Sequence, residues 1–309
     1  MFEDLKTNLK QKLMDKKIAM TKSFNKRVQV YNKINEQLKD LHQVWIKNSE
    51  NEKSFFELPF QKILHEKYNE QNQIKLMKYL SRVRESAGTK ILEDESFANQ
   101  FLNNEEFSAV ILSADIRRST ELMLKCQTPQ IYAEFLNVLT SELSDCVKNR
   151  YGIYDKFTGD GLLAFFPDFY SGKKAVLHSL QCAYDCQKIF DTIFLNYKKH
   201  FDIGDMETGI GVGIDSGTVF KAGEDLEYTV VGKPVVYACR FSASPAGHTY
   251  LTERAYRLID KSDLSSLKIK KTTIAIKHEP DSPAYDIKPV SDISFSKQIF
   301  EKPDWAIKS

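Results

Sequence analysis

The chain has 309 residues, of which 42% are hydrophobic, so it can fold around a sizeable core. Its 44 basic and 42 acidic residues leave a formal net charge of +2, which excludes a strong general attraction to nucleic acid or to a membrane surface. The start, MFEDLKTNLKQK, lacks an apolar signal core, and no apolar run is long enough to predict a transmembrane helix. Five scattered cysteines without a C-x-x-C pair favour neither a zinc site nor a disulfide framework, so the expected location is the reducing cytoplasm.

Residues 1–103 are predicted to form a helical N-terminal module. Glycine is absent before Gly88, and Pro59 is the only proline in this part. Apolar residues recur every three or four positions between Val28 and Trp45, which is typical of an amphipathic helix. Such a helix either packs on its own domain or joins two chains. The stretch is shorter than the sustained heptads that a coiled coil requires.

Residues 104–290 are predicted to form the main α+β domain, followed by a polar, loosely held tail at 291–309. Strands are expected at 108–115, in a hairpin over 151–167, and at 208–217, 228–232, 268–277 and 284–287. Helices are expected over 119–149 with an interruption at Pro129, over 171–199, and from 233 to 244. This order predicts a ferredoxin-like or related sheet, rich in antiparallel strands, with helices on one face.

The first segment that carries chemistry is ADIRRST at 114–120. Asp115 ends an apolar strand, and a turn with two arginines and two hydroxyl residues follows. A carboxylate at a strand end beside a helix N-terminus suits Mg²⁺ or Mn²⁺ with a phosphate close to backbone N–H groups. The same pattern also fits a helix-capping acid with exposed arginines.

The second segment is YDKFTGDGLLAFF at 154–166. Asp160 lies in a Gly-Asp-Gly turn that permits close approach of a ligand, although hairpin turns also carry Asp-Gly for conformational reasons alone. Lys156 interrupts an apolar strand four residues before Asp160. Tyr154, two residues before Lys156, is expected on the same strand face, where it either fills space beside a small base or belongs to the core.

The third segment is YTVVGKPVVYACR at 228–240. Arg240 follows an apolar helical stretch, so it must reach solvent, pair with an acid or meet an anion. The glycines of GIGVG (209–213) alternate along a strand and do not continue as a dinucleotide-binding motif. We expect them to give backbone clearance within the sheet.

In this order, the three segments resemble the catalytic domain of class III nucleotidyl cyclases, over about residues 107–290. The resemblance implies the metal-dependent cyclisation of a nucleoside triphosphate to a 3′,5′-cyclic nucleotide and pyrophosphate. It implies that Asp115, Asp160 and the backbone carbonyl of Ile116 bind two divalent ions, Mn²⁺ or Mg²⁺. It also implies that Lys156 and Thr229 recognise the base.

The resemblance further implies that Arg240 stabilises charge on the reacting phosphate, and Lys277 loosely matches a phosphate-binding lysine of the family. In that family the site lies between two catalytic domains. Because this chain holds both sets of residues, the resemblance implies a homodimer with two equivalent composite sites.

The chain departs from the family pattern at two places that concern the substrate. Arg118 and Ser119 replace a Gly-Phe pair, so Arg118 either adds a phosphate contact or faces solvent. Val236 replaces the asparagine that orients the ribose in the family. Lys156 is a pure donor and suits an acceptor on adenine, cytosine or uracil, and the glutamate at this position that would argue for guanine is absent.

The Arg-Arg-Ser-Thr turn and the missing asparagine make the chain similar to the bacterial pyrimidine cyclases of anti-phage defence. That similarity implies cyclic CMP or cyclic UMP as a second messenger read by a separate effector protein. An adenylate cyclase that makes cyclic AMP is the alternative, followed by a degenerate domain that only binds nucleotide or a partner.

Overall fold

A computed structural model describes residues 64, 67–223, 229–275, 281–291, 295 and 301–307. The chain divides into two compact units, Met1–Leu58 and Pro59–Ser309, and all the described residues belong to the second. The predicted amphipathic stretch Val28–Trp45 and the candidate Lys277 lie outside the described residues. Within the described part, no helix is both long and apolar enough to cross a membrane.

The second unit is built on an eight-stranded sheet with the order β2-β3-β1-β4-β6-β8-β7, in which β5 pairs with β4 off this path. All neighbouring strands are antiparallel except β4 and β6, which are parallel. The predicted α+β fold with an antiparallel-rich sheet is therefore confirmed. The strands are β1 (Glu106–Arg117), β2 (Ile153–Thr158), β3 (Gly161–Pro167), β4 (Gly209–Ala222), β5 (Thr229–Val231), β6 (Thr249–Thr252), β7 (Leu267–Ile274) and β8 (Ser282–Pro289).

Helices cover both faces of this sheet. They are α3 (Glu70–Leu80), α4 (Glu85–Glu93), α5 (Glu95–Asn103), α6 (Ser119–Leu124), α7 (Pro129–Asn149), α8 (Asp168–Ser171), α9 (Ala175–Tyr197), α10 (Lys233–Phe241) and α11 (Glu253–Tyr256). Short 3-10 turns are η1 (Lys198–His200), η2 (Asp263–Ser266) and η3 (Asp304–Ala306).

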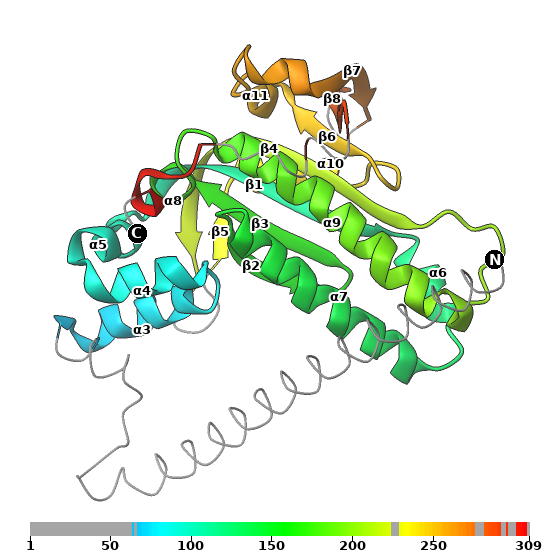
Figure 1. Ribbon diagram of the computed structural model, residues 1–309, viewed down its shortest axis with the longest axis horizontal. Coiled ribbons are helices and arrows are strands. Elements are labelled where there is room, and N and C mark those ends of the chain that lie inside the picture. Colours follow the sequence, from blue (N-terminus) through cyan, green and yellow to red (C-terminus); the bar gives the residue numbers. More distant parts are fainter. Residues whose placement is uncertain are drawn as a thin grey trace, which may run out of the picture. The chain divides into compact units, whose positions relative to one another are not determined.

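The central strand β1 has apolar side chains on both faces, so helices must cover both faces of the sheet. Val110, Leu112 and Ala114 pack into a core with α7 and α9, which lie side by side across the sheet (Figure 1). Ala109 and Ile111 point the other way, into a core with α3, α4 and α5. A strand that is apolar at consecutive positions needs cover on both faces. The expectation of helices on one face only is therefore wrong.

The interruption predicted at Pro129 is confirmed as the boundary between α6 and α7. Pro129 occupies the first turn of α7, where a missing N–H costs nothing. The Thr128 hydroxyl accepts a hydrogen bond from the Ile131 N–H at 3.3 Å and caps the helix. The resulting 21-residue helix begins its buried stripe at Phe135.

The boundary expected between residues 103 and 104 does not separate two compact parts, because α3–α5 share a core with the sheet. The turn between α3 and α4 also pairs with the sheet edge, where the Tyr154 N–H donates to the Arg82 carbonyl at 3.0 Å. The expectation of a loosely held C-terminal tail does not fit the described residues 301–307. Trp305 is buried and stacks on Tyr170, and its indole N–H donates to the Tyr170 carbonyl at 2.7 Å.

Candidate active site

The strand pairing brings Asp115 and Asp160 to one corner of the sheet. Asp115 lies near the end of β1 and pairs with Gly161, the residue directly after Asp160. The Ile116 N–H donates to the Asp160 carbonyl at 3.3 Å. In an extended strand the N–H and C=O of one residue project to the same edge, so the Ile116 carbonyl also points toward this turn. We name Asp115, Asp160 and the Ile116 carbonyl the acidic corner.

Neighbouring side chains hold the acidic corner in place. The Ser119 hydroxyl, buried at the start of α6, donates a hydrogen bond to the Asp160 carboxylate. The Tyr132 hydroxyl on α7 donates to the Ser119 carbonyl at 3.4 Å. Burial raises the pKa of Tyr132, and the Asp160 charge adds to this rise. Tyr132 therefore stays a neutral donor beside the acids.

The acidic corner already attracts one positive charge of the chain itself. The Arg117 guanidinium forms an ion pair with the Asp115 carboxylate. Its Nε is buried with no hydrogen-bond partner among the described residues. Burial lowers the pKa of Arg117, while the negative charge of Asp160 opposes this. Two carboxylates and a carbonyl are also the hard oxygen donors that Mg²⁺ and Mn²⁺ prefer, so these residues fit the divalent ions that the sequence implied.

A bulge in β2 organises a second corner. Tyr154 pairs with Ala164 and Lys156 with Leu163, so Asp155 is the extra residue between two consecutive partners. Asp155 is buried, and its carboxylate accepts a hydrogen bond from the Thr229 hydroxyl of β5 at 2.5 Å. Thr229 thus contacts Asp155, the residue directly before Lys156, which the sequence analysis did not single out.

The bulge corrects the expectation for Tyr154. Ala164 and Leu163 are adjacent in β3 and face opposite sides of the sheet, so Tyr154 and Lys156 also face opposite sides. Tyr154 packs half-buried against the core beneath α7 and α9, while Leu163 belongs to the other core. The expectation that Tyr154 shares a face with Lys156 is wrong, and its placement favours the core role.

Helix α10 carries Arg240 on the face of the sheet that Asp115 also occupies. Helix α10 packs close to β4 because Gly211 and Gly213 of that strand have no side chain. A Cβ at Gly213 would overlap the Ala238 carbonyl oxygen, and one at Gly211 would overlap the Ser244 carbonyl oxygen. These glycines give backbone clearance as predicted, but for helix α10 and the loop after it rather than within the sheet. The Ser113 and Ser242 hydroxyls lie 3.3 Å apart at this contact, and Ser113 is two residues before Asp115 on the same face.

Arg118 and Val236 are the two positions concerning the substrate at which the chain departs from the family pattern. Arg118 has a left-handed backbone with φ of 62°, and its guanidinium forms an ion pair with Glu121 on the first turn of α6. A phosphate contact from Arg118 would therefore have to replace this pair. Val236 is 47% exposed on α10, and no asparagine replaces it within that helix.

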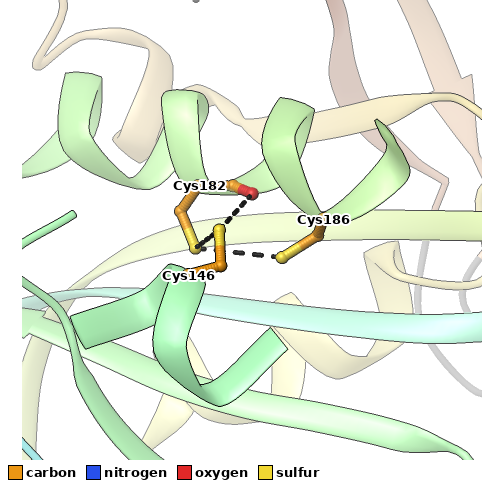
Figure 2. Close-up of side chains that lie close together, drawn as sticks. All are labelled: Cys146, Cys182 and Cys186. Atoms are coloured by element: carbon orange, nitrogen blue, oxygen red, sulfur yellow. Dashed lines mark hydrogen bonds between the residues drawn. The ribbon is translucent and has the colours of Figure 1, made fainter. Parts of the chain in front are cut away.

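The structure brings together three cysteines whose proximity was not apparent in the sequence. Cys146 of α7 and Cys182 and Cys186 of α9 are buried, and their sulfur atoms lie within 4.8 Å of one another (Figure 2). Cys182 Sγ is 3.9 Å from each of the other two sulfurs. This soft sulfur set lies inside the core, is distinct from the oxygen donors of the acidic corner, and consists of free thiols.

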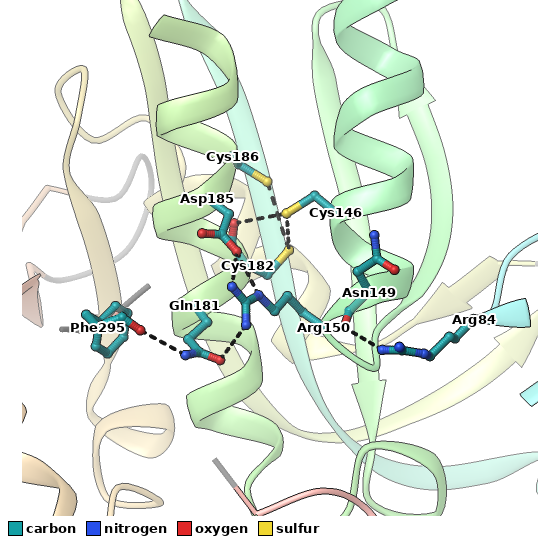
Figure 3. A network of polar contacts seen from close by, with 9 residues as sticks. All are labelled: Arg84, Cys146, Asn149, Arg150, Gln181, Cys182, Asp185, Cys186 and Phe295. Atoms are coloured by element: carbon teal, nitrogen blue, oxygen red, sulfur yellow. Dashed lines mark hydrogen bonds and ion pairs between the residues drawn. The ribbon is translucent and has the colours of Figure 1, made fainter. Parts of the chain in front are cut away.

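A polar network closes this cluster on one side (Figure 3). Arg150, at the end of α7, donates to the Asp185 carboxylate at 2.7 Å and to Gln181 Oε1 at 3.0 Å. The Gln181 amide in turn donates to the Phe295 carbonyl at 3.0 Å. Burial raises the pKa of Asp185, while the charge and hydrogen bond of Arg150 oppose this rise. The network joins α7, α9 and the C-terminal segment, which is a structural role.

The fold is that of the class III cyclase catalytic domains. Among solved structures, the chain is similar to the adenylyl cyclase CyaB from P. aeruginosa, with a TM-score of 0.52 and 24% identity over 60% of this chain and 96% of that chain. It is also similar to the guanylyl cyclase Cya2, with a TM-score of 0.51 and 20% identity over 60% of this chain and 94% of that chain. No protein-family model and no curated protein matches the sequence.

Proposed function

We propose that this chain is a metal-dependent nucleotidyl cyclase that converts a nucleoside triphosphate to a 3′,5′-cyclic nucleotide and pyrophosphate. The observation that carries the proposal is the pairing of Asp115 with Gly161, which places the Asp115 and Asp160 carboxylates at one corner of a cyclase-like sheet. The ion pair between Arg117 and Asp115 adds support, because it marks this corner as a place where positive charge is stabilised.

The residue types suit this reaction. When bound, two Mn²⁺ or Mg²⁺ ions supply Lewis acidity that lowers the pKa of the 3′-hydroxyl and neutralises the triphosphate. Asp115, Asp160 and the Ile116 carbonyl would hold them. The 3′-hydroxyl loses its proton to solvent water, the 3′-oxygen forms a bond to the α-phosphorus, and the bond from that phosphorus to the bridging oxygen breaks, so pyrophosphate leaves with the electron pair. Arg240 on α10 would stabilise the negative charge on the α-phosphate.

The base is proposed to be a pyrimidine, which makes the product cyclic CMP or cyclic UMP. Lys156 is exposed beside Thr229 and Asp155, so a base edge has both donors and acceptors within this corner. The choice of a pyrimidine, the role in bacterial antiviral defence, the cytoplasmic location and the separate effector protein that reads the product all rest on the sequence resemblance. Adenine is the alternative base.

A homodimer with composite sites is proposed for the working enzyme. In the family that the sequence resembles, the site lies between two catalytic domains, and this chain carries both sets of residues. A second chain would therefore supply the opposite wall of the site. Mixing Asp115→Ala protein with Arg240→Ala protein is expected to restore activity, since one of the two sites in a mixed dimer is intact. Heterodimers without activity would refute shared sites.

The decisive experiment incubates the purified chain with ATP, CTP, GTP and UTP in Mn²⁺ and identifies the products by mass spectrometry. We expect a cyclic pyrimidine nucleotide that disappears in Asp160→Ala and persists in Asp205→Ala, an exposed acid on the loop before β4. Cyclic AMP as the main product would support the adenylate alternative. Nucleotide binding with no product from any triphosphate would support the domain that only binds.

A further inference from the structure

Asp155 is a buried carboxylate at the predicted base-recognition corner whose role the sequence motif does not explain. Its Oδ2 accepts the Thr229 hydroxyl hydrogen at 2.5 Å. Its Oδ1 lies 3.6 Å from Arg82 Nη1 and has no hydrogen bond among the described residues. Arg82 comes from the turn between α3 and α4, so the helical segment before the sheet contributes to this corner.

The contact with Asp155 fixes what Thr229 can offer to a ligand. A hydroxyl has one hydrogen to donate and two lone pairs that accept. Because the hydrogen of Thr229 is engaged by Asp155, the hydroxyl can only accept from any other partner. Lys156, next to Asp155 in the bulge, can only donate. The corner therefore presents one fixed acceptor and one fixed donor.

An amino group and a keto group at the same position of a base reverse its donor and acceptor pattern, so this corner favours one such base over the other. Cytosine has an acceptor at N3 and a donor at its 4-amino group, whereas uracil has a donor at N3 and an acceptor at O4. Adenine and guanine differ in the same way at positions 1 and 6. Whichever of the two positions Thr229 meets, an acceptor there favours one base of each pair and disfavours the other.

We propose that Asp155, anchored by Arg82, sets the base selectivity of the site by holding the Thr229 hydroxyl as an acceptor. This inference rests on the proposed function and deepens it. Asp155 is a positioning residue, because it acts on the base through Thr229. Under the pyrimidine proposal, the choice between cytosine and uracil is made by the direction of one hydroxyl hydrogen.

This role needs Asp155 in its ionised form, and the charges around Asp155 favour that form. Burial raises the pKa of Asp155, but the Thr229 hydrogen bond and the charges of Lys156 and Arg82 all oppose that rise. The side chain of Asp155 is fully buried, while that of Arg82 is 19% exposed. A hydrogen bond to an ionised group inside protein is stronger than one between neutral groups, so the hydroxyl of Thr229 is held firmly.

The test is the substitution Asp155→Asn, which reverses the hydrogen bond with little change of shape. Arg82 attracts the amide oxygen of Asn toward itself, which turns the NH₂ group toward Thr229. The Thr229 oxygen then accepts from the amide, and its hydrogen is released toward the base. We expect the ratio of kcat/KM for CTP over UTP, and for ATP over GTP, to shift at least ~tenfold in the direction opposite to the wild-type preference.

Binding of 3′-deoxynucleoside triphosphates, which cannot cyclise, measures the same ratios without the reaction. Asp185→Asn is the matched control, since Asp185 is also a largely buried acid paired with an arginine but lies in the network beside the thiols. We expect this control to keep the wild-type ratios. Thr229→Ser should also keep the wild-type ratios. Thr229→Val, made in the chain with Asp155 unchanged, should bring both ratios toward one.

The outcomes separate the two proposals. A wild type that cyclises and binds none of the four triphosphates refutes the proposed function, and the inference with it. A wild type that is active and selective, with unchanged ratios in folded Asp155→Asn, overturns the inference alone. If Asp155→Asn does not fold, unchanged ratios in Thr229→Val overturn it instead.

Discussion

Asp115 and Arg117 lie two residues apart on one face of β1, and their side chains form an ion pair at the acidic corner. A divalent ion that binds Asp115 must therefore compete with a positive charge that the chain supplies itself. Under the proposed function, Arg117 would therefore weaken the affinity of the acidic corner for cations.

Removing this competitor should strengthen metal binding. We expect Arg117→Gln to lower the Mn²⁺ concentration for half-maximal thermal stabilisation by about tenfold, or about 1.4 kcal/mol, because one repelling charge is gone. Asp115→Asn should raise that concentration. Arg257→Gln, which breaks an exposed ion pair with Glu253, is the control that should leave it unchanged. Weaker Mn²⁺ binding in Arg117→Gln would contradict this account.

The close packing of α10 on β4 makes Gly213 a sensitive position. Gly213→Ala should destabilise the fold by about 3 kcal/mol, because the new methyl overlaps the backbone of α10 and pushes Arg240 away. Activity should fall further than stability explains. Gly88→Ala is the matched control in α4, where the methyl has room and helix propensity should add about 1 kcal/mol. Urea unfolding measures both effects.

The five cysteines should differ sharply in reactivity. Cys239 is exposed on α10, whereas Cys146, Cys182 and Cys186 are buried together. Contact with Cys146 and burial raise the pKa of Cys182 and Cys186, whereas contact with those two lowers the pKa of Cys146, so it is burial that protects all three thiols. A disulfide reagent should therefore modify Cys239 within seconds and these three only after denaturation. Rapid modification of the buried thiols in folded protein would show that α7 and α9 separate easily.

Acid should weaken the fold through His178. Burial lowers the pKa of His178 to about 4, and its Nε2 is buried with no hydrogen bond to a described residue. Between about pH 6.5 and 4 the unfolded chain binds a proton that the folded chain does not. The free energy of unfolding should therefore fall as the pH drops through this window, by up to about 3 kcal/mol from this group. In His178→Leu, the fall should be smaller by that amount, as measured by urea unfolding at each pH.

The proximity of Asp115 and Asp160 could be predicted because both acids lie next to clear strand patterns. The apolar run before Asp115 and the glycines around Asp160 determine a strand end and a hairpin, and pairing of the two follows from their lengths. Ser119 and Arg117 were visible in the same turn but had no distinguishing pattern. Their contacts depend on how α6 leaves the strand, which is a tertiary property.

The arrangement of Lys156, Thr229 and Asp155 was predicted only in part, because the bulge changes which residues share a face. Strict alternation of side chains along a strand predicts that Tyr154 and Lys156 share a face, and it gives no reason to single out Asp155. One signal was available: Tyr154 and Phe157 are both apolar but three residues apart, and both pack against the same core. An odd spacing of core residues within a strand indicates an extra residue between them.

Other differences come from contacts between distant segments. The strand β6 is only four residues long and was not predicted, since its pairing with β4 and β8 rather than its own pattern defines it. Cys146 and Cys182 are 36 positions apart and meet only because α7 and α9 pack together. The burial of Trp305 likewise depends on partners more than a hundred residues away.

That aromatic contact has a consequence for synthesis of the chain. Trp305 packs against Phe97 of α5 as well as Tyr170, so the core beneath α3–α5 includes residues from both ends of the compact unit. On the ribosome, this core stays incomplete until Trp305 has emerged. Phe97 and its neighbours are thus exposed to chaperones until then, while the core under α7 and α9 can form earlier.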